Sequence, residues 1–568
     1  MGRIPAGTWA FLLYLALAVL LFSSVWISAD RRLAFGDVDV RELTWFMGWT
    51  PYALSHAQTP LFTTHIDYPS GVNLMWNTGL FMPAFLLWPV TATLGPIVAS
   101  TTALTLAVAF SAWAAYLVAR RYVHQQAGAI GAGLVYGFSP LMISQSVGHL
   151  HVTVAIFPPL ALLALDEILV RQRHPSWLVG GALGVGAVAQ LLTGAEILAL
   201  TVLFAAVGTA VLAAVHWRQI PARLPYVAKA LIAALIVALP LAAYPLWMQF
   251  FGPERVYGTL PDAYNTDLYA PFIPTQWQLF RFAPSLGDRL ISRNVFELGG
   301  AYIGIPLILI CAWVTVRLWS RPIVRLASIM AVAATILAMG DTLHRDGHAT
   351  RWPLPWRLLE HLPLMQNTSP PRFMLFTYLG VALLLAVFID WALTRPSRAP
   401  RLAGIGATIV ALLALFPAVP YPSDLAVVPD FFRAGGGAGR IPTGSVVLVA
   451  PFSRHFTSDA MMWQSIAGMS FRMPEGYAYR PGPTRDPPAS ALQTQLNAIY
   501  YDLDRQPLTP QLEQQFRDDL GRMGVGTVVV GPEPREAEVL DLFRQTLGRE
   551  PEQAGGVAVW WSISLPAA

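Results

Sequence analysis

The sequence predicts a polytopic helical membrane protein, with about eleven transmembrane helices and a small α/β domain after them. Of its 568 residues 55% are hydrophobic and only 12% are charged, about half the share of roughly 25% that is usual in soluble domains. Repeated apolar runs of about 20 residues are long enough to cross a hydrocarbon core of ~30 Å. After Tyr421 these runs stop and short β-rich runs begin. We therefore predict a membrane domain over 1–420 and a soluble domain over 421–568.

The predicted spans follow from the length and composition of each apolar run. The first run follows a basic N-terminus, but it is long for a signal peptide and has no clear cleavage site, so we interpret it as a retained helix. Residues 79–95 are short and interrupted by Pro83 and Pro89, and we assign them to a helix lying at the outer interface. The predicted spans are 9–28, 97–119, 127–143, 152–169, 177–193, 197–216, 226–248, 299–316, 323–339, 373–393 and 402–420.

The arginines in the connections predict the orientation. Alternate connections carry arginines, from Arg120 and Arg121 to Arg395 and Arg398, whereas the short loops between them carry neither Arg nor Lys. The positive-inside rule makes the arginine-rich set cytoplasmic. The N-terminus is then cytoplasmic and the C-terminal domain is extracytoplasmic, in the cytoplasmic (inner) membrane of a bacterium. The net charge of +4 reflects these loops and does not imply nucleic acid as a partner.

Three long loops, 29–96, 249–298 and 340–372, lie on the predicted outer face. A chain that only reverses direction needs a few residues, and long irregular loops are usually functional. We therefore expect the protein to act at its outer face.

The segment after Tyr421 alternates between strand-like and helix-like patterns, which indicates an α/β domain. It contains no Gly-rich phosphate loop, no CxxC pair and no nucleophile elbow, so we interpret it as a recognition or stability module. The β-rich runs are 444–452, 525–531 and 557–565, and the helical patterns lie near 488–503, 510–523 and 534–546.

Two carboxylates, Asp37 and Asp39, open the first outer loop close to the predicted membrane surface. Asp is a favoured N-cap and helical spacing of apolar residues begins just after Asp39, so a capping turn is one interpretation. A catalytic carboxylate is the other. Trp45 and Trp49 are typical of a helix at a membrane interface, and we predict such a helix over 40–56.

Further polar groups in the outer loops lie near predicted helix ends and are candidates for substrate binding. The two histidines of "GHLHV" suit a metal or a solvated hairpin tip. The glutamate of "FELGGAYIGIP" lies at the entrance to the hydrocarbon and needs a partner there. The candidates are Asp67, Asn73, His149, His151, Asp267 and Glu297.

Arg372 is the best-placed cation. In "NTSPPRFMLF" two prolines precede it, and proline suits the first position of a helix. Arg372 then lies in the first turn of the tenth span, where its guanidinium and the helix N–H groups favour a phosphate. The alternative is an arginine that only reaches to lipid headgroups.

These residues, in this order, resemble the GT-C superfamily of integral membrane glycosyltransferases, which use polyprenyl-phosphate-linked sugars. The superfamily includes protein O-mannosyltransferases, aminoarabinose transferases and mycobacterial arabinosyl- and mannosyltransferases. The resemblance covers most of the chain, and uncharacterised bacterial members are also similar at "DLYAPFIPT", "FELGGAYIGIP" and "LPLMQNTSPPRF". Such members often carry a second arginine about four residues before the last one, where this chain has Thr368.

The resemblance implies a mechanism for the acidic motif. The essential carboxylate of the superfamily maps onto Asp37, which would act as a general base on the acceptor hydroxyl, with inversion at the anomeric carbon. Arg372 would hold the donor phosphate. Asp39 would orient the base, bind the acceptor or hold a divalent cation, and no other cofactor is implied. The expected partners are a polyprenyl-phosphate sugar, membrane lipids, and a glycan, lipid or protein acceptor.

Two other readings stay open. A transporter or lipid flippase would place charged residues within its spans and break helices in corresponding halves, whereas the candidate charges here gather at outer helix ends. A non-catalytic scaffold of the cell envelope is the other alternative.

Overall fold

The computed structural model describes residues 5–36, 38–77, 79–215, 217–257, 264–293, 299–362, 365–453, 457–481 and 489–563. Its contacts divide the chain into two compact units, each built from separate stretches of sequence. The first unit comprises Met1–Trp26, Thr102–Tyr244 and Thr259–Pro422, and the second comprises Ile27–Thr101, Pro245–Gly258 and Ser423–Ala568. The second unit thus combines the predicted C-terminal domain with the whole of the first outer loop, 29–96, and the bounds 1–420 and 421–568 stay a prediction.

A helix occurs at each of the predicted spans. Six helical segments are long and apolar enough to cross a membrane: Pro96–Ala119, Gln126–Gln145, Leu150–Arg171, Ala195–Ala214, Trp217–Phe251 and Pro370–Leu393. Four further apolar helices are shorter, at Ala6–Leu21, Ser176–Leu191, Ile305–Arg317 and Pro322–Ala338. The protein is therefore a mostly helical, multi-pass membrane protein, and the number of eleven spans stays a prediction.

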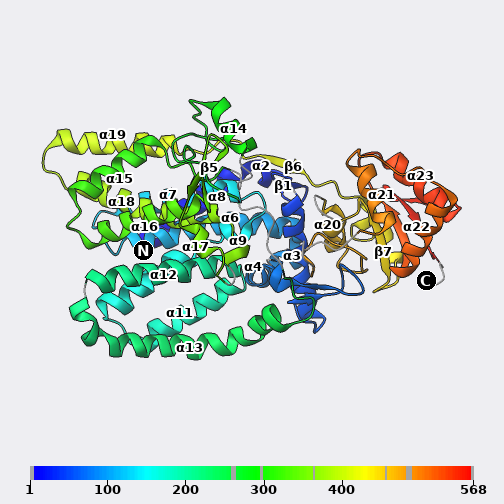
Figure 1. Cartoon of the computed structure of the whole chain (residues 1–568), viewed down its shortest axis with the longest axis horizontal. Helices are drawn as coiled ribbons and strands as arrows, with labels where there is room; N and C mark the ends of the chain where they lie inside the picture. The colour runs from blue at the N-terminus through cyan, green and yellow to red at the C-terminus, as the bar shows by residue number, and fades with distance from the viewer. Residues whose placement is uncertain are drawn as a thin grey trace, which may run out of the picture. The chain divides into compact units, whose positions relative to one another are not determined.

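The first unit consists mainly of these helices (Figure 1). A small antiparallel pair, β4 with β5, follows α16. The elements are α1 (Ala6–Leu21), α2 (Ser23–Trp26), most of α6 (Pro96–Ala119), α7 (Gln126–Gly137), α8 (Pro140–Gln145), α9 (Leu150–Thr153), α10 (Phe157–Asp166), the π-helical turn η2 (Glu167–Arg171), α11 (Ser176–Leu191), α12 (Ala195–Val215), η3 (Trp217–Gln219), most of α13 (Ile220–Phe251), α14 (Pro284–Arg293), α15 (Ile305–Arg317), α16 (Pro322–Ala338), β4 (Thr342–Arg345), β5 (His348–Pro353), α17 (Trp356–Leu359), η4 (Met365–Asn367), η5 (Pro370–Phe373), α18 (Met374–Leu393) and α19 (Arg398–Ala414).

Helix α18 is the core of this unit. It is apolar on every side and its hydrophobic stretch is entirely buried, as expected for a helix surrounded by others. Helices α7, α15, α16 and α19 all pack against it. Near its C-terminal end, the Asp390 carboxylate accepts the N–H groups of His124 (2.9 Å) and Gln125 (2.8 Å), directly before α7. This buried side chain therefore satisfies backbone donors at the start of a neighbouring helix.

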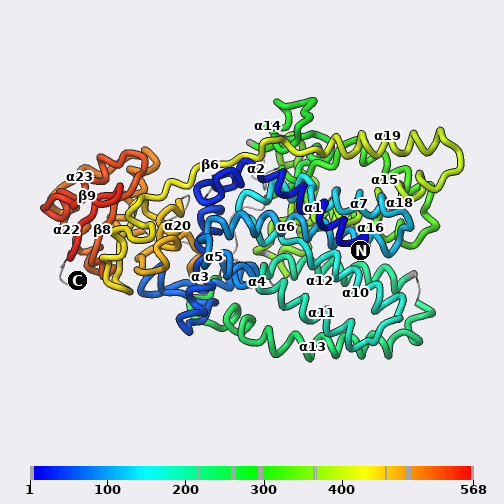
Figure 2. The backbone as a smooth tube through the Cα atoms, turned by 180° about the vertical axis from the view of Figure 1, so that it is seen from behind, coloured from blue at the N-terminus to red at the C-terminus, as the bar shows by residue number. Residues whose placement is uncertain are grey.

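Helices α10, α11 and α12 pack together and lie beside one another in Figure 2. Two glycines one turn apart, Gly180 and Gly184, let α11 approach α13 closely. A Cβ at either position would lie less than 3.0 Å from a carbonyl oxygen, that of Ala230 or Ala234. Small residues at such spacing are typical of helix pairs in membranes. The outer side of α13 is apolar and exposed, which suits contact with lipid.

The second unit holds the remaining strands and several short helices. The helices α4 and α5 occupy the stretch predicted to lie at the interface, and both are too short to span a membrane. The elements are β1 (Arg32–Ala34), α3 (Val38–Ser55), β2 (Phe62–Thr63), β3 (Val72–Asn73), η1 (Leu74–Trp76), α4 (Phe81–Leu86), α5 (Trp88–Leu94), β6 (Ser423–Leu425), η6 (Asp430–Phe432), η7 (Gly437–Arg440), β7 (Val446–Ala450), α20 (Asp459–Ile466), α21 (Ala491–Tyr500), α22 (Pro510–Arg522), β8 (Val525–Val530), α23 (Glu536–Leu547), β9 (Glu552–Ala554) and β10 (Val557–Trp560).

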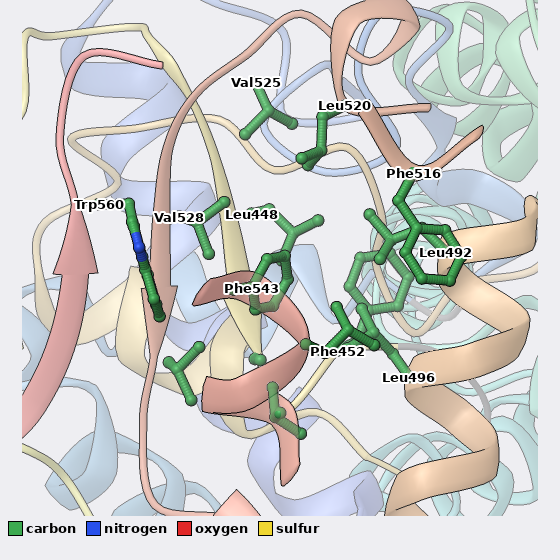
Figure 3. Close-up of a cluster of buried hydrophobic side chains, with 14 of the residues drawn as sticks. Leu448, Phe452, Leu492, Leu496, Phe516, Leu520, Val525, Val528, Phe543 and Trp560 are labelled. Atoms are coloured by element: carbon green, nitrogen blue, oxygen red, sulfur yellow. The ribbon is translucent and has the colours of Figure 1, made fainter. Parts of the chain in front are cut away.

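A four-stranded sheet in the order β7-β8-β10-β9 organises the C-terminal part of this unit. Strands β7 and β8 are parallel, and the other two pairs are antiparallel. Figure 3 shows side chains of the sheet, among them Leu448 and Trp560, meeting Leu492 of α21, Phe516 of α22 and Phe543 of α23 in one buried cluster. Strands and helices thus occur at the predicted places, and β9 and the helix α20 are additions.

Helix α3 was expected at the membrane interface because of its tryptophans. The helix is present, but Trp45 and Trp49 are fully buried and stack on each other with ring centroids 5.6 Å apart. The indole N–H of Trp45 donates to Gln464 Oε1 of α20 (2.7 Å), and that of Trp49 to Pro60 O (2.9 Å). These rings therefore belong to the interior of the second unit, where packing against α20 covers them.

Candidate functional site

Arg372 lies in η5, the single turn that leads into α18, as the two prolines predicted. Its guanidinium forms an ion pair with Glu196, which lies in the first turn of α12. The Ser369 N–H donates to the other oxygen of that carboxylate, Oε1, at 3.0 Å. Both charged side chains are largely buried, with 13% of Arg372 and 15% of Glu196 exposed. Ser369, Arg372 and Glu196 therefore form an anion-binding cluster, which we call the Arg372 site.

The two predicted histidines lie close to this site. His149 Nδ1 is 2.7 Å from Gln145 Oε1, and the rings of His149 and His151 are 5.7 Å apart. His151 is buried, and its imidazole lies near enough to Arg372 for their charges to interact. His151 is therefore packed inside the first unit, so the expectation of a solvated hairpin tip is wrong for this residue, whereas His149 is half-buried.

An apolar cavity of about 690 Å³ lies among α10, α12, α13, α16 and α18 of the same unit. Phe204 and Phe376 line it and stack with ring centroids 4.3 Å apart. Phe204 also contacts Phe373, whose ring centroid is 5.6 Å away and which follows Arg372 directly in the chain. One residue of the cavity wall, Phe204, is therefore in contact with the residue next to Arg372. Polar residues of the predicted cytoplasmic connections, Arg171 and Arg223, also line the cavity.

In the second unit, Asp39 lies within the first turn of α3 rather than before it, because the helix begins at Val38. Its carboxylate accepts the hydroxyl of Tyr477 at 3.0 Å. Burial, and then the Asp39 carboxylate, raise the pKa of Tyr477, so this hydroxyl stays protonated and remains a donor. Burial and Asp39 also raise the pKa of Glu42, one turn further along. The two groups beside Asp39, Tyr477 and Glu42, therefore favour their neutral forms.

Asp67 pairs with the same segment of chain as Asp39. It is buried, and Arg480 Nη1 lies 2.8 Å from its Oδ1. Two acidic residues of the first outer loop are therefore partnered by Tyr477 and Arg480, which are three residues apart and precede α21.

The predicted substrate-binding residues Asn73 and Asp267 use their polar atoms inside their own units. Asn73 Nδ2 donates to Met248 O (2.8 Å) and Pro253 O (3.0 Å), while its Oδ1 accepts from Met75 N (3.2 Å). Asp267 is fully buried, and its two oxygens accept N–H groups at 2.8 and 2.9 Å from either side. Both contribute to folding, and a role for them in binding substrate stays a prediction.

Asp37 and Glu297 lie outside the described residues, so their predicted roles stay untested. Within the described part of the chain, no three His, Cys, Asp or Glu side chains are grouped so that they could hold a metal ion. Asp39 accordingly has no such set of co-ligands for a divalent cation among the described residues.

Sequence reasoning missed four residues of these groups: Glu196, Ser369, Tyr477 and Arg480. Glu196 had a signal, because the predicted topology places it at the outer end of a span, as it does Arg372. Tyr477 and Arg480 lie in "EGYAYRPG", an irregular stretch that indicates no helix or strand.

Comparison with known proteins adds a family and several similar folds. The family described as a domain of unknown function, DUF6311, matches residues 6–418. Among curated proteins, none matches the sequence.

Three solved structures are similar to the chain along most of its length. The arabinofuranosyltransferase AftD from Mycobacteria is 15% identical, with a TM-score of 0.49 over 99% of this chain, which spans 40% of AftD. ArnT from Cupriavidus metallidurans, bound to undecaprenyl phosphate, is 12% identical, with a TM-score of 0.45 over 96% of this chain and 97% of ArnT. The oligosaccharyltransferase AglB from Archaeoglobus fulgidus, with an inhibitory peptide and a dolichol-phosphate, is 12% identical, with a TM-score of 0.43 over 92% of this chain and 69% of AglB. All three belong to the GT-C superfamily. Because each TM-score is below 0.5, the proposal below rests on this chain's own residues.

Proposed function

We propose that this chain, which belongs to the DUF6311 family, is a GT-C-type membrane glycosyltransferase. It would move a sugar from a polyprenyl-phosphate donor to an acceptor hydroxyl on the outer face of the cytoplasmic membrane. The acceptor is a glycan, a lipid or a protein.

The observation that carries the proposal is the Arg372 site beside the apolar cavity of the first unit. A lipid phosphate needs a cation and backbone donors for its head and an apolar channel for its tail. Arg372 and the Ser369 N–H supply the donors, and the cavity wall at Phe204 and Phe376 lies next to them through Phe373. A transporter of ions would have little use for so apolar a cavity.

The reaction needs one base and one anion site. The acceptor oxygen attacks the anomeric carbon while the bond from that carbon to the phosphate oxygen breaks, so the configuration inverts. The acceptor proton passes to the Asp37 carboxylate, and the departing lipid phosphate keeps the bond electrons. Arg372 stabilises the charge that grows on this phosphate. The leaving group is already anionic and needs no general acid.

Asp39 supports this chemistry from the first turn of α3. The Tyr477 hydroxyl orients its carboxylate, which stays available to bind an acceptor hydroxyl. Asp67, paired with Arg480, would hold the segment around Tyr477 against the first loop. His149 and His151 belong to the surroundings of the donor phosphate.

The test uses the purified full chain with a panel of radiolabelled polyprenyl-phosphate sugars and an envelope extract. Wild type should consume one donor, and Asp37→Asn should lose transfer by about 10²–10⁴-fold, since loss of a general base has that effect. Donor binding should be unchanged in this variant, because Asn keeps the shape of the side chain. Asp424→Asn, an exposed carboxylate of the second unit, is the matched control and should stay active.

Full activity of Asp37→Asn would show that another residue is the general base. Movement of labelled lipid between leaflets without sugar transfer would favour a flippase. A phenotype that survives Asp37→Asn would favour a scaffold. Alkaline phosphatase fused after Ala568 should be active if the C-terminus is extracytoplasmic, and a silent fusion would overturn the orientation.

A further inference from the structure

The Arg372 site already holds an anion of the protein's own. One carboxylate oxygen of Glu196 forms the ion pair with the Arg372 guanidinium. The other oxygen, Oε1, accepts the Ser369 N–H at 3.0 Å. A phosphate would use the same two donors, because guanidinium groups and backbone N–H groups at the start of a helix are its usual ligands. Glu196 therefore occupies the place of a phosphate.

A second observation shows that the carboxylate fills this site incompletely. Ser369 is 5% exposed, and its buried Oγ has no hydrogen-bond partner among the described residues. A buried hydroxyl without a partner is unfavourable. Both oxygens of Glu196 are engaged elsewhere, whereas a phosphate brings additional acceptor oxygens. The Ser369 hydroxyl is thus a donor that a phosphate can use and that Glu196 leaves unused.

The two anions exclude each other. Arg372 and Glu196 are both largely buried, and two negative charges repel strongly where water is scarce. A phosphate that enters the Arg372 site must therefore displace the Glu196 carboxylate from Arg372.

We propose that Glu196 is a built-in competitor of the donor phosphate. Its carboxylate closes the Arg372 site in the ligand-free protein, leaves when a lipid phosphate enters, and returns as the lipid-phosphate product departs. Ser369 then completes the phosphate site with its hydroxyl. This inference rests on the proposed function, since it assigns regulation to the donor site. Glu196 lowers donor affinity and speeds product release.

The experiment measures binding of undecaprenyl phosphate to the full chain in nanodiscs, for wild type and four variants. If Glu196 closes the site in about nine molecules of ten, Glu196→Gln should bind roughly tenfold more tightly, because apparent affinity scales with the competent fraction. Glu196→Asp, which keeps the charge on a shorter side chain, should lie between the two and covers the case in which the Gln variant folds poorly. Ser369→Ala and Arg372→Gln should bind several-fold more weakly than wild type.

Two controls isolate the phosphate. Asp288→Asn removes one exposed carboxylate from the same unit and should leave binding unchanged, which excludes a general effect of net charge. Undecaprenol, which has no phosphate, should bind Glu196→Gln and wild type equally, and inorganic phosphate shows whether the head group alone suffices for the difference.

The outcomes separate this inference from the proposed function. If Arg372→Gln weakens binding but neither Glu196 variant tightens it, Glu196 is no competitor and the donor site stands. If Arg372→Gln binds as wild type does, the donor site itself is wrong and the inference falls with it.

Discussion

Glu196 and Arg372 are 176 positions apart in the sequence and form one ion pair at the starts of two apolar helices. Neither residue is well solvated, so the pairing helps to compensate both charges. The pair thus fixes where α12 and α18 begin relative to each other within the first unit. It also keeps a guanidinium at the edge of an apolar cavity, where an isolated cation would be costly.

The ion pair should be visible as thermodynamic coupling. Arg372→Gln and Glu196→Gln should each lower the free energy of unfolding by about 2–3 kcal/mol, because each removes one half of a largely buried ion pair. The double variant should cost about 1–3 kcal/mol less than the sum of the two. Unfolding midpoints in detergent at one scan rate give the comparison. Strict additivity would show that the two side chains do not interact in the folded protein.

Asn73 should matter for stability more than for substrate binding. Asn73→Ala removes the donor to Met248 O and Pro253 O and the acceptor of the Met75 N–H, and should cost about 2–3 kcal/mol. Asn73→Asp should cost more, because it places a carboxylate against the carbonyls of Met248 and Pro253. Thermal unfolding of both variants, with donor binding measured on the folded fraction, tests this order. A variant with the wild-type midpoint and no donor binding would instead make Asn73 a ligand of the substrate.

His65 makes the stability of the second unit depend on pH. Burial, together with Arg472 and His56, lowers its pKa from 6.5 to about 4, and its ring lies 5.1 Å from those of Trp49 and Tyr52. Because the folded state disfavours protonation of His65, the stabilisation of the folded state by the neutral imidazole is complete above pH 6.5. It is lost as the pH falls towards 4. The loss between pH 7 and 5 should be roughly 2 kcal/mol.

His65→Gln should remove this part of the pH dependence, because a glutamine does not titrate. The measurement is the unfolding midpoint of both proteins at pH 7 and pH 5 in the same detergent. Equal slopes for the two proteins would assign the acid sensitivity to other groups.

The helices of the first unit could be predicted because long apolar runs leave few alternatives to a membrane helix. The turn before α18 was also predictable, since Pro370 and Pro371 restrict the chain locally. The partner of Arg372 was not, because that depends on which helix starts meet in three dimensions. Gly180 and Gly184 show the same limit, since their spacing indicates a close contact but does not name α13 as the partner.

The second unit was harder to predict because its contacts join distant segments. Asp39 meets Tyr477 across 438 positions, and no local pattern in "EGYAYRPG" indicates such a contact. Trp45 and Trp49 are residue types that are typical of a helix at a membrane interface. They lie in the interior because α20 packs against their helix. Strand β9, Glu552–Ala554, was missed because it is polar and lies at the edge of the sheet, where alternation of apolar residues is absent.

Asp39 and Asp37 should respond differently to the same substitution. Asp39→Asn should keep transfer within about threefold of wild type, because the Tyr477 hydroxyl can donate to an amide oxygen as it does to a carboxylate. Tyr477→Phe should be equally mild. Asp37→Asn should lose about 10²–10⁴ in rate, since only a carboxylate can accept the acceptor proton. The comparison uses donor-lipid consumption at matched protein levels.

A chelator tests whether Asp39 orients the groups around it or holds a divalent cation. If Asp39 only orients its surroundings, EDTA should leave wild type and Asp39→Asn equally active, because the described residues provide no cluster of ligands around it. A carboxylate that holds a divalent cation cannot be replaced by an amide without loss of affinity, since hard cations prefer charged oxygen ligands. Inhibition of the wild type by EDTA, reversed by added Mg²⁺ or Mn²⁺, together with an inactive Asp39→Asn, would therefore make Asp39 a metal ligand.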